Sequence, residues 1–282
     1  MRTNNSNLEN IINNNLNNLS INWESTPYPH AIIDNFLPQE VFSEITNYLE
    51  KKSKLEDIKK DFSTYIESNK QVYGDKDLDK ILKLPITIIG GEKIKKIFSN
   101  FFKIDKIISL TDFPNYGGYY PFHVMKNNGL LGSHIDHSHS ENGKLHIANA
   151  IYYATKYWDK NWGGDTLLLN SIGTKIIKKI EFIPNRLILF IHSAKSFHAV
   201  SKICAPNDIK RNTYYMDYYT DKENKKLISK EKNLFFCYHL TTFVPFFPLG
   251  LKSFKINYIF KLSTYKYLWI FFKYTISRLF KL

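Results

Sequence analysis

Apolar side chains in the first hundred residues recur at helical spacing, whereas those further along alternate as in β-strands. A short strand is predicted at residues 30–34. Helices are predicted at residues 38–50 and 91–102, because apolar positions there repeat every three or four residues. The stretch 51–83 between them is rich in Lys, Asp and Glu, and we expect it to be part helix and part loop.

From about residue 104 the pattern predicts short strands separated by turns. Turn signals include Asn127-Asn128-Gly129 and Gly163-Gly164. Because helices come first and strands follow without βαβ alternation, we expect an α+β fold whose strands form a sandwich or jelly roll. The predicted strands are residues 107–113, 119–125, 144–154, 165–170, 175–182, 186–192, 197–203 and 211–220.

Composition divides the chain into three parts. Residues 1–22 contain ten Asn and few apolar anchors, and we expect this leader to be disordered. Residues 23–220 are predicted to form one domain, with a helical part at 38–103 and the jelly-roll part at 104–220. A charged linker and then a basic, aromatic extension with helical character occupy residues 221–282.

The overall composition excludes several classes of protein. A hydrophobic fraction of 43% and an aromatic fraction of 16% support a sizeable core and argue against global disorder. Two cysteines, Cys204 and Cys237, cannot form a disulfide framework, so nothing indicates an oxidising compartment. The N-terminus lacks a basic segment followed by an apolar one, so no secretory signal is predicted and we expect a cytoplasmic location. The apolar run 234–251 is interrupted by Pro245 and Pro248, which makes it a poor transmembrane helix.

The net charge of +13 is concentrated near the C-terminus. Residues 233–282 carry seven Lys or Arg and no acid, interleaved with aromatic residues. This composition favours a peripheral contact with a membrane or another anionic surface, and no nucleic acid is expected as a partner. Residues 261–282 are compatible with an amphipathic helix that lies on such a surface. The alternative is that the aromatic residues pack on the core while the lysines are solvated.

One pair of residues suggests metal chemistry. His134 and Asp136 are two positions apart, so on a strand their side chains point to the same side. A second imidazole, His198, lies on a later predicted strand and would complete a set of two His and one carboxylate. Such a set leaves one side of the metal open and is typical of Fe(II) sites that carry out oxygen chemistry. A His-x-Asp pair alone is weak evidence, because a solvated loop pair or a structural hydrogen bond has the same pattern.

The ordered context of this pair makes the pattern more specific. The pair itself stands in Gly132-Ser133-His134-Ile135-Asp136. Further motifs accompany it, and together they occupy residues 29–37, 129–136, 151–153, 162–167, 184–190, 197–200 and 211–213. In these segments, taken in this order and spread from residue 27 to residue 220, the chain resembles the Fe(II)/2-oxoglutarate-dependent oxygenases, in particular the prolyl 4-hydroxylase-like branch.

The resemblance implies a double-stranded β-helix (jelly-roll) fold with Fe(II) held by His134, Asp136 and His198. It also implies that Arg211 binds the distal carboxylate of the co-substrate 2-oxoglutarate, with Thr213 adding a hydroxyl hydrogen bond. A guanidinium suits that role because it pairs bidentately with a carboxylate. The expected reaction consumes O₂ and 2-oxoglutarate, with L-ascorbate as a further expected requirement. It hydroxylates a substrate, such as a peptidyl proline, a sugar, a lipid or a small molecule, and yields succinate and CO₂.

Two other functions remain open alternatives. One is a non-catalytic jelly-roll module that binds or senses a ligand, although intact His134, Asp136, His198 and Arg211 argue against it. The other is a cupin-like metalloenzyme that does not use 2-oxoglutarate. Arg211 and the ordered motifs disfavour that alternative.

Several nearby residues are ambiguous. Many members of this family bind 2-oxoglutarate through a Tyr shortly before the His-x-Asp glycine, where this chain has Met125 and Lys126. Asn149 is expected to face the pocket. A zinc cluster of His137, His139 and His146 is disfavoured because no Cys accompanies it. Five tyrosines are candidates for binding 2-oxoglutarate, with core packing as the alternative: Tyr119, Tyr120, Tyr152, Tyr214 and Tyr218. Trp158 and Trp162 are candidates for the wall of a substrate groove, with loop anchoring as the alternative.

Overall fold

The computed structural model describes residues 12, 14–16, 19–51, 60–74, 78–113, 120–247, 249 and 254–280. Of the leader expected to be disordered, residues 12 and 14–16 are helical, and Ile12 is buried in the main core cluster. The remainder of residues 1–18 lies outside the described part.

The N-terminal part contains helices and a hairpin. The predicted strand corresponds to β1 (His30–Ile33), and the two predicted helices correspond to α2 (Gln39–Lys51) and α4 (Glu92–Phe102). A further helix, α3 (Lys80–Ile89), precedes α4. The interpretation of residues 51–83 as helix and loop is wrong in its middle, where β2 (Lys60–Ser63) pairs with β3 (Glu67–Tyr73). Strand β3 gains its stability from pairing with a distant strand, residues 122–131, and local charge does not reveal that pairing.

The strands of the second half follow the predicted order. They are β4 (Ile108–Ser109), β5 (Phe122–Ile135), β6 (Leu145–Tyr153), β7 (Thr166–Leu169), β8 (Ile176–Ile180), β9 (Leu187–Ile191), β10 (His198–Val200) and β11 (Arg211–Thr220). The predicted strand at 107–113 is mostly wrong, because β4 ends after two residues and the 3-10 helix η2 (Leu110–Asp112) follows.

Strand β5 turns the sheet into a jelly roll. Its first half, residues 122–125, pairs with β11, and its second half pairs with β10. The strand order β1-β9-β6-β11-β5-β10-β7-β8 therefore folds over at β5, so that two sheets face each other. The turn expected at Asn127-Asn128-Gly129 is instead a bulge within β5, where Asn128 has a positive φ of 61°. A bulge bends its strand without ending it.

Among the described residues, three hydrophobic clusters stabilise the molecule. The largest lies between the helices α2–α4 and the sheet that contains β6, β9 and β11. A second, built around Tyr153, Phe182 and Phe190, lies between the two sheets. The third joins Phe197 and Ile135 to the C-terminal extension through Cys237, Val244 and Tyr274. The extension is thus packed on the domain along part of its length.

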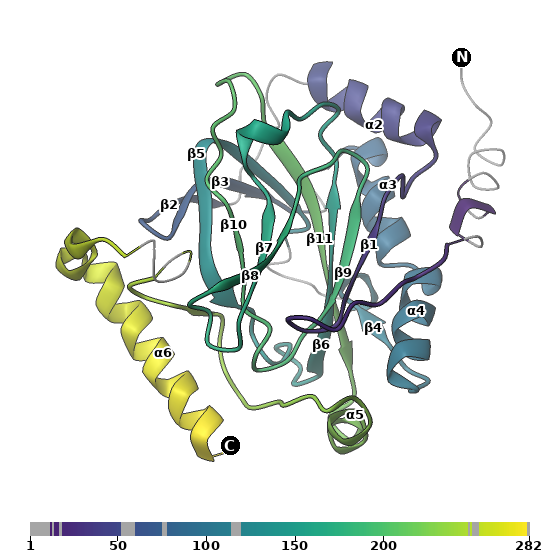
Figure 1. Ribbon diagram of the computed structural model, residues 1–282. Coiled ribbons are helices and arrows are strands. Elements are labelled where there is room, and N and C mark those ends of the chain that lie inside the picture. Colours follow the sequence, from purple (N-terminus) through teal and green to yellow (C-terminus); the bar gives the residue numbers. More distant parts are fainter. Residues whose placement is uncertain are drawn as a thin grey trace.

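The C-terminal extension has defined structure. The expected linker contains α5 (Asn224–Lys232), whose Ile228 is buried in the main core cluster. Strand β12 (Thr242–Phe243), the 3-10 helix η5 (Ile256–Phe260) and α6 (Leu262–Phe280) follow. In Figure 1, α6 (yellow) lies on the opposite side of the strands from α2–α4. Among the described helices, none is both long and apolar enough to cross a bilayer.

Candidate active site

The end of β5 and the start of β10 bring two histidines and a carboxylate together. His198 pairs with His134 in the register of the two strands, and their ring centroids are 4.2 Å apart. Asp136 follows β5 directly. Its carboxylate oxygens lie 3.6 Å from His134 Nε2 and 3.4 Å from His198 Nε2. The three residues that the sequence singled out therefore direct one ligand atom each toward a common point, within 4.8 Å of one another.

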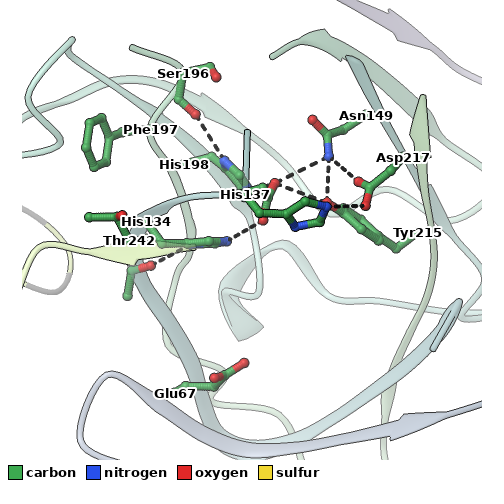
Figure 2. A network of polar contacts seen from close by, with 12 residues as sticks. Glu67, His134, His137, Asn149, Ser196, Phe197, His198, Tyr215, Asp217 and Thr242 are labelled. Carbon is green, nitrogen blue, oxygen red and sulfur yellow. Dashed lines mark hydrogen bonds and ion pairs between the residues drawn. The ribbon is translucent and has the colours of Figure 1, made fainter. Parts of the chain in front are cut away.

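Backbone carbonyls set the tautomer of both histidines. His134 Nδ1 lies 2.9 Å from the Gly132 carbonyl, and His198 Nδ1 lies 3.2 Å from the Ser196 carbonyl, a contact drawn in Figure 2. Since a carbonyl only accepts hydrogen bonds, each Nδ1 must carry the proton. Each Nε2 then has a free lone pair, which is how protein histidines are prepared to bind metals.

Electrostatics keep His134 and Asp136 in the forms that bind a cation. Burial, with a smaller contribution from the neighbouring His198, lowers the pKa of His134 to about 3. Burial alone would raise the pKa of Asp136, but His198 and His134 outweigh it and hold that pKa below its ordinary value. Two imidazoles and one carboxylate fit Fe(II) as a ligand set.

Two polar side chains donate hydrogen bonds to the carboxylate of Asp136. Asn149 on β6 donates from Nδ2 at 3.3 Å, and the Tyr215 hydroxyl on β11 donates at 3.1 Å, both to Oδ2. Asn149 also donates to the Tyr215 hydroxyl and to Asp217, which links the group into one network (Figure 2). The sequence singled out Asn149 but not Tyr215, because the alternation of β11 alone does not reveal which tyrosines face inward.

Arg211 is a buried cation with spare hydrogen-bonding capacity. It is 3% exposed, and its guanidinium lies over the rings of Phe182 and Tyr153 at 4.9 and 5.3 Å. Its Nε donates to the Gly164 carbonyl at 2.7 Å, and Nη1 approaches the Thr213 hydroxyl at 3.5 Å. Its Nη2 has no hydrogen-bond partner among the described residues. Burial lowers the pKa of Arg211, which is the cost of keeping a guanidinium away from water.

The close contact between Arg211 and the backbone at position 164 requires glycine there. Gly164 has a φ of +75°, and a Cβ added there would lie 3.2 Å from Arg211 Cδ and 3.0 Å from the Trp158 ring. Trp158 holds this loop by donating from Nε1 to the Gly163 carbonyl at 2.8 Å. Trp158 and Trp162 pack edge to face at 5.5 Å, so the interpretation as loop anchors fits their contacts.

One cavity joins the histidine–aspartate group to Arg211. It has a volume of about 180 Å³ and is lined by His134, Asp136, His198, Arg211 and Thr213. Apolar side chains make up much of the remaining wall, and Lys70 and Tyr215 also line it. Its two ends therefore differ in chemistry, with two imidazoles and a carboxylate at one end and a fixed positive charge at the other. The residues that line both ends and the wall are His134, Asp136, His198, Arg211, Thr213, Met125, Leu131, Ile151, Val200, Lys70 and Tyr215.

A second buried group lies beside the first. His137 and His146 gather with Asp217, and not with His139, whose Nδ1 is hydrogen-bonded to Ser138. Both His146 nitrogens face carbonyl oxygens, and Nε2 also lies 3.2 Å from Asp217. Burial opposes charge on His146, but Asp217 outweighs it and raises the pKa of His146. The group is thus arranged as a buried ion pair.

Three of the tyrosines considered for co-substrate binding point away from the cavity. Tyr152, Tyr214 and Tyr218 belong to the main core cluster on the helix side of the sheet. Tyr152 donates to Asn185 at 3.0 Å, and Tyr218 donates to the Ile89 carbonyl. Tyr119 lies outside the described residues. The core interpretation holds for the three described candidates on β6 and β11.

The C-terminal extension also reaches this site, which the sequence did not reveal. Strand β12 pairs with the end of β5, with Phe243 opposite His134. The Phe243 ring stacks on the His134 imidazole at a centroid distance of 5.1 Å and an interplanar angle of 22°. A two-residue strand carries too little local pattern to be predicted.

Comparison with known protein families agrees with this geometry. Residues 120–216 match the family model described as the 2OG-Fe(II) oxygenase superfamily. The matched segment contains His134, Asp136, His198 and Arg211. This part of the chain is similar to a 2OG-Fe(II) oxygenase domain. The resemblance described from the sequence is thereby confirmed, and the matched segment lies within the jelly roll.

Solved structures of the same class are similar to the chain. A prolyl-4-hydroxylase from Pseudomonas putida is 12% identical, with a TM-score of 0.49 over 76% of this chain and 98% of that one. A prolyl hydroxylase from Trichoplax adhaerens, solved with a hypoxia-inducible-factor peptide fragment, is 17% identical, with a TM-score of 0.46 over 80% and 97%. HygX from Streptomyces hygroscopicus, with nickel, 2-oxoglutarate and hygromycin B bound, is 10% identical, with a TM-score of 0.45 over 68% and 82%. No curated protein matches the chain.

Proposed function

We propose that this chain is an Fe(II)- and 2-oxoglutarate-dependent dioxygenase that hydroxylates an organic substrate and releases succinate and CO₂. One observation carries the proposal. A single cavity is lined at one end by His134, Asp136 and His198 and at the other by Arg211, a buried guanidinium whose Nη2 has no partner among the described residues. A dicarboxylate that bridges the two ends would satisfy both.

His134, Asp136 and His198 would hold Fe(II) through two Nε2 atoms and a carboxylate oxygen. When bound, Fe(II) supplies the redox chemistry that couples O₂ to oxidation of 2-oxoglutarate and of the substrate. Arg211 binds the far carboxylate of 2-oxoglutarate, and Thr213 lies close enough to add a hydroxyl. Asn149 and Tyr215 fix the orientation of Asp136 by donating to its Oδ2. The apolar wall of Met125, Leu131, Ile151 and Val200 limits the access of water.

The alternatives are less consistent with these contacts. A barrel metalloenzyme that does not use 2-oxoglutarate would have no use for a buried guanidinium with an unpaired nitrogen, which is costly to fold. A binding module without catalysis would not need the Nε2 atoms of two histidines to face one carboxylate. The proposed dioxygenase accounts for both features.

The test is turnover of the co-substrate. The full chain, given Fe(II), ascorbate, O₂ and 2-oxoglutarate, should form succinate even without its substrate, and 2-oxoglutarate should bind the Mn(II)-loaded protein in anaerobic calorimetry. His134→Ala should abolish succinate formation, whereas His139→Ala, which removes a histidine outside the cavity, should retain it. Absence of both succinate and calorimetric binding in the wild-type protein would overturn the proposal.

A further inference from the structure

The C-terminal helix α6 carries large apolar side chains on both of its faces. Its inner face packs against the rest of the protein. Tyr274 is buried and donates from its hydroxyl to the Ala194 carbonyl at 2.7 Å, and Tyr267 packs on Phe243 at 5.3 Å. Thr264 donates to the Tyr258 carbonyl at 2.6 Å. The Tyr274 contact docks the helix on the jelly roll, the other two hold it to the rest of the extension, and its opposite face is left outward.

The outer face is aromatic and aliphatic where an ordinary surface helix is polar. With about 3.6 residues per turn, its exposed apolar residues fall on the side of the helix away from Tyr274. Trp269 is 57% exposed and Phe272 is 51% exposed, and they stack on each other at 5.9 Å. The exposed apolar residues of α6 are Leu262, Tyr265, Leu268, Trp269, Phe272, Leu279 and Phe280.

The preceding 3-10 helix η5 also exposes large apolar side chains. In η5, Phe260 is 82% exposed and Ile256 is 71% exposed. Because η5 directly precedes α6, we group these side chains with the exposed apolar residues of α6 and call the set the outer face of the extension. Exposed apolar surface of this extent marks a contact with a protein or a membrane.

The charge of this region identifies the kind of partner. Lys255, Lys261, Lys266 and Lys273 are exposed next to the apolar residues, and Lys273 lies over the Trp269 ring at 5.0 Å. Residues 233–282 contain no acidic residue. Trp, Phe and Leu beside lysines on one helix are typical of helices that lie in the interface of a bilayer with anionic lipids.

A second copy of the chain fits this face less well. In a two-fold symmetric contact the same surface meets itself, so the lysines of both copies would face each other with no acid to pair them. Because none of the described helices could span a bilayer, the helix would lie flat on the membrane.

We propose that the outer face of the extension, formed by η5 and α6, binds the surface of a membrane that contains anionic lipids. The inference is independent of the proposed catalytic function. It would nevertheless place the proposed catalytic domain at the membrane surface. The inner face of α6 contacts Phe243, which in turn stacks on His134, so the site would be held close to the bilayer.

Co-sedimentation of the full chain with vesicles tests the proposal. The probe is phosphatidylcholine vesicles with about 30% phosphatidylserine, compared with pure phosphatidylcholine. The wild-type chain should partition strongly onto the anionic vesicles only. Trp269→Ser with Phe272→Ser, and separately Lys266→Glu with Lys273→Glu, should each weaken partitioning by about tenfold or more. All four residues are exposed, so circular dichroism and the melting temperature should stay at wild-type values.

Two matched controls distinguish binding through the outer face of the extension from nonspecific effects of net charge and of exposed aromatic residues. Lys226→Glu with Lys230→Glu makes the same charge change on exposed positions of α5, and Tyr157→Ser removes an exposed aromatic residue elsewhere. Both should bind vesicles like the wild type. Equal loss in the α5 variant, or unchanged binding in both α6 variants, would overturn the proposal. A dimer that Trp269→Ser with Phe272→Ser dissociates, or RNA that displaces the vesicles, would also overturn it by assigning the face to another partner.

Discussion

The Phe243 ring lies against the His134 imidazole at 5.1 Å and 22°, although the two residues are more than a hundred positions apart. The contact exists because β12 pairs with the end of β5, with Phe243 opposite His134. The C-terminal extension is therefore part of the wall behind a proposed metal ligand. Tyr267 of α6 supports Phe243 in turn at 5.3 Å.

Replacement of Phe243 should damage both stability and the metal site. Phe243 is buried, so Phe243→Ala should lower the free energy of unfolding by about 3 kcal/mol through lost contacts and a cavity. The freed His134 ring should also weaken Mn(II) binding, measured by competition with a chelator. Phe254→Ala, at a more exposed position of the same extension, is the control and should change neither quantity. Wild-type stability and metal affinity in Phe243→Ala would show that the stacking is incidental.

The packing of β12 on β5 also predicts the stability and activity of a truncated chain that ends near Asp221. Such a chain loses β12 and the buried residues Cys237, Val244 and Tyr274 of the third core cluster. We expect it to be unstable and to form no succinate, which is measured by thermal unfolding and by turnover. A stable, fully active truncated chain would contradict the role assigned here to β12.

Arg211 should govern affinity for 2-oxoglutarate more than it governs metal binding. Hydrogen bonds to charged groups contribute about 1.5–3 kcal/mol, so Arg211→Gln should raise the dissociation constant of 2-oxoglutarate roughly 10- to 150-fold. Calorimetry on the Mn(II)-loaded protein measures the change. Arg278→Gln, at a surface arginine bonded to the Ser171 carbonyl, is the control. If Arg211→Gln binds 2-oxoglutarate like the wild type, the co-substrate does not lie at this end of the cavity.

Asn149 and Tyr215 are predicted to be positioning residues that act through Asp136. Removing polar groups that orient a metal ligand typically costs 10- to 100-fold in metal affinity or activity. Tyr215→Phe and Asn149→Ala should therefore raise the dissociation constant of Mn(II) by about that factor, with a smaller effect on the dissociation constant of 2-oxoglutarate.

Tyr214→Phe is the matched control for Tyr215→Phe. The Tyr214 hydroxyl is buried and has no hydrogen-bond partner among the described residues, so its removal should leave metal affinity unchanged and stability equal or higher. Equal metal affinity in Tyr215→Phe and Tyr214→Phe would contradict the positioning role of Tyr215.

The sequence predicts the parts of the site that depend on local pattern. The two-residue alternation of His134 and Asp136 and the order of the later strands suffice to bring these residues and His198 near one another. Features that depend on distant pairing are not predictable in this way. Asn128 resembles a turn residue and forms a bulge in β5, the β2–β3 hairpin is stabilised by β5, and Phe243 reaches His134 only through β12. Tyr215 and Asp217 were missed because burial on both sides of β11 removes the polar alternation.

Acid should destabilise the metal-free protein through its buried neutral histidines. Burial lowers the pKa of His134 to about 3 and that of His239 to about 4. Between pH 6.5 and pH 4 the unfolded chain therefore binds protons that the folded chain does not, so the free energy of unfolding falls as pH falls. The slope is up to about 1.4 kcal/mol per pH unit for each such histidine. Urea unfolding with chelator at pH 6.5, 5.5 and 4.5 measures it. His239→Gln should reduce the slope by the contribution of one proton, and Lys226→Gln on exposed α5 should not. An unchanged slope in His239→Gln would mean that this imidazole takes up its proton in the folded state as readily as in the unfolded chain.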